Sequence, residues 1–115
     1  MNKGYSVTVL DKLTYAGGKD NLSAIEAKIN LIIGDICDTG TVRGSLEGID
    51  CVVHMAAESH NTRSEFDPDV FYRTNVEGTK VMLDESIRAG VKKFIHTSTD
   101  EVYGSLAAPA EADET

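Results

Sequence analysis

Four short apolar runs, separated by segments that favour helices, constrain the fold of this chain most strongly. The runs occupy residues 5–10, 29–34, 51–56 and 92–98, and each is rich in valine, isoleucine or phenylalanine. They alternate little between apolar and polar residues, which is typical of strands buried on both faces of a parallel sheet. Because parallel strands need crossover connections, the runs predict strands that are joined through helices.

Two of the connecting segments predict short helices. Residues 20–28 favour one such helix, and residues 38–48 favour another. The second begins with Asp38 as a candidate N-cap and ends at Gly48, with Val42 and Leu46 one turn apart.

The strongest helix signal covers residues 67–89. Asp67 can cap its N-terminus, Pro68 suits the first helical position, and Gly90 ends the pattern. One face of this helix carries a recurring stripe formed by Tyr72, Val76, Thr79, Leu83 and Ile87. The alternation of strands and helices predicts an α/β fold, a doubly wound parallel (Rossmann-like) sheet of about four strands.

The composition is that of one globular domain and argues against two classes of partner. The chain has 115 residues, of which 41% are hydrophobic and 26% are charged. Its 19 acidic and 11 basic residues give a formal net charge of -8, which no Lys/Arg cluster relieves. Such a surface repels phosphate backbones and anionic bilayers, so neither nucleic acid nor a membrane is expected as a partner.

The sequence also bears on the cellular compartment. No run approaches the ~20 apolar residues of a membrane span, and the first residues do not resemble a signal peptide. The expected location is therefore the cytoplasm. Cys37 and Cys51 have neither metal-ligand nor C-x-x-C spacing, so we expect reduced thiols and no metal site.

The residues that directly follow the strands form a coherent set. In an open parallel sheet, ligands bind beyond the carboxyl ends of the strands. Asp11 follows the first run, where a carboxylate can accept hydrogen bonds from both hydroxyls of an adenosine ribose and repels a 2′-phosphate. This favours NAD over NADP as the ligand, although the neighbouring Lys12 argues the other way.

The second and third runs end in residues that suit a flat ligand. Asp35 and Ile36 follow the second run and could surround an adenine ring, but Asp35 is equally typical of a helix cap or turn. Ala56 and Ala57 follow the third run and leave room for a cofactor near the backbone. Close packing of a helix explains these two alanines equally well.

The fourth run ends in Thr99, Asp100 and Glu101. Two neighbouring acids in a pocket cannot both ionise cheaply, so the pair would keep one proton and offer a general acid beside a general base. Because side chains alternate faces along a strand, this requires that the strand has already ended before Asp100. The alternative is a solvated acidic turn.

Some other patterns do not predict a site. Tyr15 and Lys19 have the spacing of a catalytic Tyr-x-x-x-Lys pair, but two intervening glycines argue against a helix that would bring both to one face. His54 and His96 lie within apolar runs and are expected in the core. His60 follows a strand but has no metal-ligand spacing.

Several longer motifs carry a resemblance to a known family. They are LDKLTYAG at 10–17, GDIC at 34–37, HMAAESHNTRS at 54–64, TNVEGT at 74–79 and HTSTDEVYG at 96–104. In their order and separation they resemble the extended short-chain dehydrogenase/reductase family, and within it the branch that dehydrates dTDP-glucose. The similarity extends over nearly the whole chain.

The resemblance implies NAD as cofactor and a nucleotide sugar as substrate. Members oxidise the hexose at C4 by passing hydride to NAD, eliminate water across C5 and C6, and return the hydride to C6. By this resemblance Asp100 protonates the departing hydroxyl, Glu101 takes the C5 proton, and Thr99 and Ser59 bind substrate. The implied cofactor-binding residues are Asp11, Lys12, Leu13, Thr14, Asp35, Ile36, Met55, Ala56, Ala57, Glu58, Ser59 and Thr74.

The sequence departs from the family pattern at its ends and at one internal position. Members begin with a strand and a Gly-x-x-Gly-x-x-Gly turn that binds pyrophosphate, and they carry a Tyr-x-x-x-Lys beyond the last motif. Residues 1–115 are therefore expected to form a partial NAD-binding domain without the central first strand. Thr62 also stands where the family usually has Asp.

The missing strand has a physical consequence. Without it, the strands should separate into two pairs with unsatisfied edges facing each other. We therefore expect a truncated chain that is unstable or aggregates alone, and cooperative unfolding of a monomer in circular dichroism would contradict this.

Two other functions accompany the dehydratase as alternatives. One is another NAD-dependent nucleotide-sugar epimerase or decarboxylase, although such relatives usually carry a different residue at the position of Asp100. The other is a non-catalytic remnant that binds nucleotide weakly or contributes to an interface. In the family, helices such as 67–89 commonly contribute to a homodimer, which this sequence alone does not show.

Overall fold

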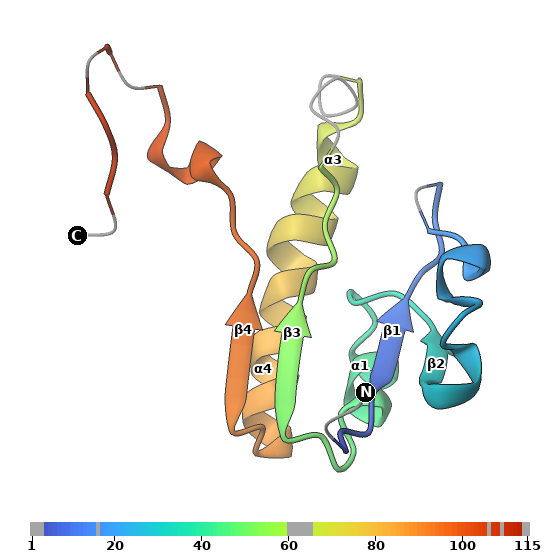
Figure 1. Cartoon of the computed structure of the whole chain (residues 1–115). Coiled ribbons are helices and arrows are strands. Elements are labelled where there is room, and N and C mark those ends of the chain that lie inside the picture. Colours follow the sequence, from blue (N-terminus) through green and yellow to red (C-terminus); the bar gives the residue numbers. More distant parts are fainter. Residues whose placement is uncertain (1–3, 16, 60–65, 106, 109, 114–115) are drawn as a thin grey trace.

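The fold was analysed in a computed structural model (Figure 1). The structure describes residues 4–15, 17–59, 66–105, 107–108 and 110–113. The expectations for His60 and Thr62 concern residues outside this part, and the motif at 54–64 is described as far as Ser59.

Four strands lie in the described part, and each overlaps one of the four apolar runs. They are β1 (Thr8–Asp11), β2 (Asn30–Ile33), β3 (Cys51–His54) and β4 (Lys93–His96). β1 pairs with β2 and β3 pairs with β4, both in parallel, so the described strands form two two-stranded sheets. The predicted parallel α/β architecture and the division into two strand pairs are confirmed.

The two sheets lie next to each other without a strand ladder between them. Across the molecule the order is β4, β3, β1, β2 (Figure 1), and no hydrogen-bonded pairing joins β3 to β1 among the described strands. The Cα radius of gyration is 16.2 Å, whereas a compact domain of this length has about 13 Å. The chain is therefore less condensed than a complete domain.

The helix predicted at 38–48 is confirmed in position and in its cap. Helix α1 spans Thr39–Ser45, and the Asp38 carboxylate accepts the N–H of Thr41 at 2.6 Å. This hydrogen bond lowers the pKa of Asp38. Because the side chain satisfies an N–H that the first turn leaves unpaired, it fixes where the helix begins.

The helix predicted at 20–28 differs in the structure. The segment forms two short 3-10 helices, η1 (Lys19–Leu22) and η2 (Glu26–Lys28), with a turn between them. At that turn both the N–H and the hydroxyl of Ser23 donate to the Asp20 carbonyl. Such local bonds from serine compete with the i to i−4 ladder of a regular helix, which is why the pattern breaks here.

The helix predicted at 67–89 is confirmed at both ends, but its middle is not a regular α-helix. It consists of α3 (Pro68–Phe71), the π-helix η3 (Tyr72–Gly78) and α4 (Thr79–Ala89). Asp67 caps the start, since its carboxylate accepts the Val70 N–H at 3.3 Å, and Gly90 ends the helix at φ 72°. π-helical turns are rare and concentrate at functional sites, so this segment bears on the site below.

Four of the five residues of the predicted stripe face away from the rest of the chain, whereas Thr79 is half-buried and its Oγ1 lies 3.0 Å from His54 Nε2. Tyr72, Val76, Leu83 and Ile87 are all exposed, Ile87 by 77%. The packed face instead carries Gly78, Met82, Glu85 and Ser86, which are buried toward α1 and the loop after β2.

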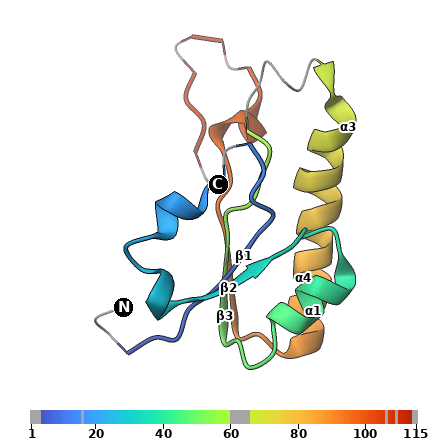
Figure 2. The same ribbon diagram turned by 90° about the vertical axis from the view of Figure 1, so that its right-hand side faces the viewer.

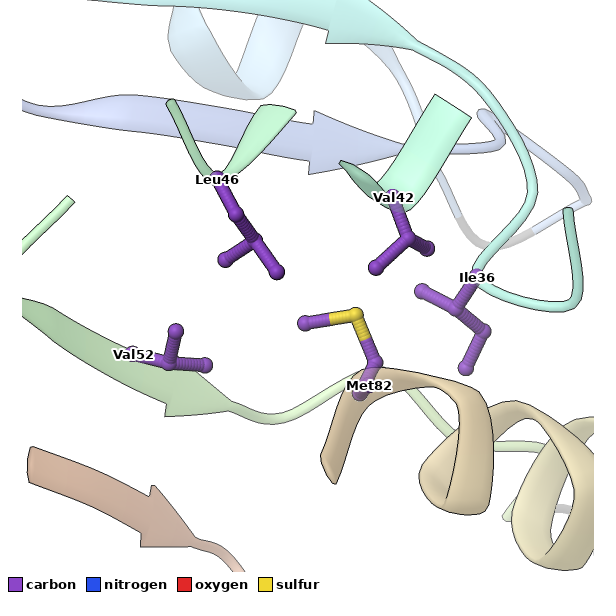
Figure 3. Close-up of a cluster of buried hydrophobic side chains, with 5 residues drawn as sticks. All are labelled: Ile36, Val42, Leu46, Val52 and Met82. Carbon is purple, nitrogen blue, oxygen red and sulfur yellow. The ribbon is translucent and has the colours of Figure 1, made fainter. Parts of the chain in front are cut away.

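A small core lies between the strands and one helical layer. Five apolar side chains form it: Ile36, Val42, Leu46, Val52 and Met82. Met82 reaches from α4 toward Val42 of α1 and Leu46, the C-cap of α1, with Val52 of β3 and Ile36 at the two sides (Figure 3). This cluster joins the β1–β2 half of the chain to the β3–β4 half.

The helices α1 and α4 lie on one side of the strands (Figure 2). On β3, Val52 and His54 are buried, whereas Cys51 and Val53 between them are exposed. Val53 pairs in register with Ile95 of β4, and these two side chains are 58% and 41% exposed. The prediction that the strands are buried on both faces is wrong for this structure, because no described helix covers the second face of β3 and β4.

A buried acid ties α1 to α4. The side chain of Glu85 is only 2% exposed, and it accepts hydrogen bonds from Arg43 at 2.9 Å and from Arg88. The Arg43 hydrogen bond is the main cause that keeps the pKa of Glu85 below its usual value. Paired in this way, the carboxylate stays charged where an unpaired acid would be costly.

Candidate functional site

The carboxyl ends of the strands point to one end of the molecule. Figure 1 shows β1, β3 and β4 with their arrowheads in the same direction, and β2 is parallel to β1. The residues that follow the strands therefore gather at this end. This is where ligands bind in open parallel sheets.

Asp11 is held by a tight turn at the end of β1. Its Oδ1 accepts the backbone N–H of Leu13 at 2.7 Å, and Leu13 itself has φ 51°, a conformation that residues with a side chain rarely adopt. The N–H of Gly17 then closes the turn onto the Thr14 carbonyl at 2.9 Å. A Cβ on Gly17 would lie 2.8 Å from Leu13 Cα and 3.2 Å from Asp11 Oδ1, so glycine is needed for this approach.

Asp35 connects the second strand end to the first. Its Oδ1 accepts the Cys37 N–H at 2.9 Å, while its Oδ2 lies 2.7 Å from Lys12 Nζ and 3.7 Å from a guanidinium nitrogen of Arg73. Burial raises the pKa of Asp35, but the hydrogen bonds from Lys12 and Cys37 outweigh it, and the pKa lies below its usual value. Asp35 is thus a turn former, as one interpretation held, and it also contacts a residue of the predicted ribose site.

Ile36 and Cys37 pack the second strand end against the π-helix. Ile36 is 7% exposed, and a Cβ on Gly78 would lie only 2.6 Å from Ile36 Cδ1. The thiol of Cys37 donates to the Arg73 carbonyl at 3.3 Å. Burial and the nearby Asp35 raise the pKa of this thiol, so it is held protonated, and both cysteines are free as predicted.

The loop after β3 is fixed by a residue that the sequence analysis did not single out. The Asn75 side chain accepts the Glu58 N–H at 2.8 Å and donates to the Glu58 carbonyl at 2.9 Å. This paired bond joins the loop to η3, the segment that also contains Thr74. The TNVEGT motif contains this asparagine, and an asparagine side chain can both accept from a backbone N–H and donate to a backbone carbonyl.

The predicted residues of this loop line an open surface. Met55, Ala56, Ala57 and Ser59 are exposed, and Glu58 is half-buried. No packed helix covers the two alanines in the described part of the chain, so the alternative that they serve helix packing is not supported.

The acids at the fourth strand end lie on a 3-10 turn. β4 ends at His96 and η4 spans Asp100–Tyr103, so the strand has ended before Asp100, as the acid–base interpretation requires. Thr99 Oγ1 accepts the Glu101 N–H and donates to Asp100 Oδ1, both at 3.3 Å. All three residues are exposed, so burial, the other condition for a shared proton, is not met in this structure.

The two strand histidines have different environments. His54 is 3% exposed and its Nε2 lies 3.0 Å from Thr79 Oγ1, which confirms it as a core residue with a hydrogen-bond partner. Burial lowers its pKa, and so does the nearby His96. His96 stacks on it with ring centroids 5.2 Å apart but is exposed, so its predicted place in the core is wrong. His96 lies on the same face of the sheet as its register partner His54, but β4 is the outer strand of the pair, and no described element covers His96 there.

Other potential sites find no support in the described residues. Tyr15 lies in a turn and Lys19 begins η1, so no regular helix brings this pair to one face, as predicted. The described side chains include no cluster of three or more His, Cys, Asp or Glu residues that could bind a metal ion. Among the described helices, none is both long and apolar enough to cross a membrane.

Parallel strands, a helical layer and polar residues gathered at the strand ends define a Rossmann-like α/β protein. Comparison with protein families narrows this class. The chain belongs to the NAD dependent epimerase/dehydratase family, whose model matches residues 1–115. The expected family is therefore confirmed.

Two curated relatives illustrate the similarity in sequence. A dTDP-glucose 4,6-dehydratase of Streptomyces griseus is 54% identical over 102 residues, which are 87% of this chain and 31% of that protein. Its counterpart in Streptomyces antibioticus is 51% identical over 100 residues, 87% of this chain and 30% of that protein. The chain thus spans about a third of the length of these relatives.

Solved structures agree on the fold. A dTDP-glucose 4,6-dehydratase from Streptomyces venezuelae, solved with NAD bound, superposes with a TM-score of 0.87 at 45% identity and covers 92% of this chain and 34% of that chain. A UDP-glucose 4-epimerase from Thermus thermophilus in complex with NAD superposes with a TM-score of 0.85 at 26% identity. It covers 98% of this chain and 36% of that chain.

Proposed function

We propose that this chain is part of an NAD-dependent nucleotide-sugar dehydratase that converts dTDP-glucose to dTDP-4-keto-6-deoxyglucose. The observation that carries the proposal is the difference in identity between two groups of relatives. Curated dTDP-glucose 4,6-dehydratases are 44–54% identical to this chain. Solved UDP-glucose 4-epimerases, the runner-up class, are 26–34% identical.

The residues at the ends of β1 and β2 fit the adenosine part of NAD. The fixed carboxylate of Asp11 can accept hydrogen bonds from ribose hydroxyls, and Asp35 with the backbone of Ile36, whose side chain is buried in the core, can lie against adenine. The exposed loop after β3 has small side chains that allow a close approach to the backbone. The proposed cofactor contacts are Asp11, Lys12, Leu13, Thr14, Asp35, Ile36, Met55, Ala56, Ala57, Glu58, Ser59 and Thr74.

The proposed chemistry of this chain's own residues lies at the fourth strand end. When bound, NAD supplies the hydride acceptor and donor for the sugar. Glu101 removes the C5 proton, Asp100 protonates the departing C6 hydroxyl, and Thr99 and Ser59 bind the sugar. The exposed positions of Asp100 and Glu101 support access to a substrate, and bound substrate would supply the burial that separates their protonation states.

The product of the natural protein that contains this sequence tests the proposal. Incubation with dTDP-glucose and NAD should yield a 4-keto-6-deoxy sugar nucleotide, identified by mass spectrometry as the loss of one water. Turnover of a UDP-sugar with no loss of water from dTDP-glucose would instead favour an epimerase or decarboxylase. No turnover and no NAD binding would favour the non-catalytic remnant.

We also propose that the exposed stripe of η3 and α4 contributes to a homodimer. Tyr72, Val76, Leu83 and Ile87 present an apolar surface along one helix, and helix faces of this kind are buried when two copies pair. Val76→Glu and Ile87→Glu should shift the sedimentation coefficient from dimer to monomer. An unchanged coefficient in both variants would contradict the dimer. The cytoplasmic location stays a prediction, which cell fractionation can test.

A further inference from the structure

Lys12 raises a problem for selection between the two nicotinamide cofactors. It directly follows Asp11, so its Cα lies about 3.8 Å from that of the residue proposed to bind the ribose. A lysine at this place is a natural partner for a phosphate on the ribose 2′-hydroxyl. Asp11 alone therefore does not explain why NADP should be rejected.

Asp35 changes the electrostatics of this lysine. Its Oδ2 lies 2.7 Å from Lys12 Nζ, although the two residues are 23 positions apart and belong to different strand ends. The carboxylate is itself fixed, because its other oxygen accepts the Cys37 N–H at 2.9 Å. The Lys12 ammonium is thus paired with a carboxylate at the end of β2, and the hydrogen bond from Cys37 keeps this carboxylate in place.

A second cation is drawn to the same oxygen. Arg73 reaches from η3 to within 3.7 Å of Asp35 Oδ2. Asp11, Asp35, Lys12 and Arg73 together carry two negative and two positive charges, so the group is neutral. Removing the charge of Asp35 alone would leave this group with a net positive charge and two cations without their partner.

We propose that Asp35 is a specificity-determining residue, which withholds Lys12 and Arg73 from a 2′-phosphate and thereby selects NAD over NADP. This inference rests on the proposed function, because it requires that the adenosine ribose lies at Asp11. Asp11 repels the additional phosphate directly, and Asp35 removes the attraction that the two neighbouring cations would otherwise exert on it.

The test compares the affinities of NAD and NADP in the natural protein by isothermal titration at one ionic strength. Because Asp35 also lines the proposed adenine site, Asp35→Asn weakens both cofactors by a common factor, which cancels in their ratio. The ratio should shift toward NADP on the order of tenfold, and added salt should reduce this shift. A ratio that stays at the wild-type value would overturn the inference.

Variants of Lys12 show whether the effect passes through this lysine. Because Asp35 already holds Lys12, Lys12→Met alone should change the ratio by less than about twofold. Because Lys12 is half-exposed, Lys12→Met should fold even if Asp35→Asn does not, so the test stays decisive. If Lys12 were instead available to the 2′-phosphate, Lys12→Met would bind NADP about tenfold more weakly, which would contradict the inference. In Asp35→Asn/Lys12→Met, most of the shift should disappear, and its full persistence would overturn the role of Lys12.

Asp50→Asn is the charge-matched control. It removes a similar ion pair, Asp50 with Lys92 at 2.6 Å, just before β3 at the opposite end of the strands. An equal shift in this variant would show that net charge, not the contact with Lys12, sets the ratio. If wild-type protein binds NAD but Asp35→Asn leaves the ratio unchanged, only this inference fails. If wild-type protein binds neither cofactor, the proposed function fails with it.

Discussion

The ends of β1 and β2 are organised by this chain itself, whereas the end of β4 is not. Asp11 and Asp35 each accept a backbone N–H two residues later, at 2.7 and 2.9 Å, and Lys12 joins the two strand ends. Asp100 and Glu101 are exposed on a short 3-10 turn, where the two hydrogen bonds of Thr99 Oγ1 are each 3.3 Å long. The first region is held in place by hydrogen bonds within this chain, and the second leaves its two acids open to solvent.

This difference follows from where the partners of each acid lie in the sequence. Asp11 and Asp35 are held mainly by N–H groups two residues away, which any folded form of this segment provides. A shared proton between Asp100 and Glu101 needs a closed, poorly solvated pocket, and the described part of this chain leaves them open. Mutations at the ends of β1 and β2 should therefore change the affinity for NAD, whereas mutations at the end of β4 should change the rate of turnover.

The largest expected effect is on turnover. Asp100→Asn and Glu101→Gln should each lower kcat for dehydration by about 10²–10⁴-fold, the usual contribution of general acid–base catalysis. The affinity for NAD should be unchanged, because neither residue is among the proposed contacts of the adenosine. The control is Glu26→Gln, an exposed acid in η2 that should leave kcat at the wild-type value. Wild-type turnover in either catalytic variant would remove that residue from the mechanism.

The next effect is on cofactor affinity. Asp11→Ala should weaken NAD binding by about 10²-fold in a titration, because charge-assisted hydrogen bonds contribute about 1.5–3 kcal/mol each. Asp11→Asn keeps an acceptor for the Leu13 N–H but loses the charge, so it should lie between the alanine variant and wild type. If all three proteins bind NAD equally, Asp11 does not contact the ribose.

A smaller effect is expected on stability where the end of β2 packs against η3. Gly78→Ala places a methyl group 2.6 Å from Ile36 Cδ1, which is buried and cannot move freely. Overpacking of this kind should lower the free energy of unfolding by about 1–3 kcal/mol, measured with urea. Gly44→Ala is the matched control, because nothing lies within 4 Å of its Cβ and α1 should gain stability. Equal destabilisation of the two variants would show that Gly78 has no special packing role.

The smallest expected effect is on the pH dependence of the stability that the Glu85 ion pairs contribute between α1 and α4. The pKa of Glu85 is lower in the folded chain than its usual value of 4.5, so its ion pairs stabilise the fold above that pH. The stabilisation should be lost as the pH falls through the lowered value. Thermal unfolding should therefore show a higher midpoint for wild type than for Glu85→Gln at neutral pH, with the difference shrinking in acid. A difference that does not depend on pH would contradict this.

Short patterns allowed much of the fold to be predicted from the sequence. Caps such as Asp38 and Asp67, and the left-handed Gly90, depend on neighbours within a few residues, and the structure has each of them. Four apolar runs with helices between them were enough to predict parallel strands. The division into two pairs followed from the family topology that the motifs indicated.

Features that depend on distant partners were not predictable. The bond from Asn75, in the π-helix, to Glu58 joins residues 17 positions apart, and the Lys12–Asp35 pair joins two strand ends. The exposed faces of His96 and Val53 depend on which elements cover a sheet, which no local pattern reports. For the site, the sequence could place candidate residues at the strand ends but not their contacts with one another.

A titration of NAD into the Asp100→Asn/Glu101→Gln double variant, beside Asp11→Ala, tests the separation of the two regions most directly. The double variant should keep the wild-type Kd within about twofold, because its substitutions are isosteric and distant from the proposed ribose site, while Asp11→Ala should lose affinity. Loss of NAD binding in the double variant to the extent seen in Asp11→Ala would contradict it.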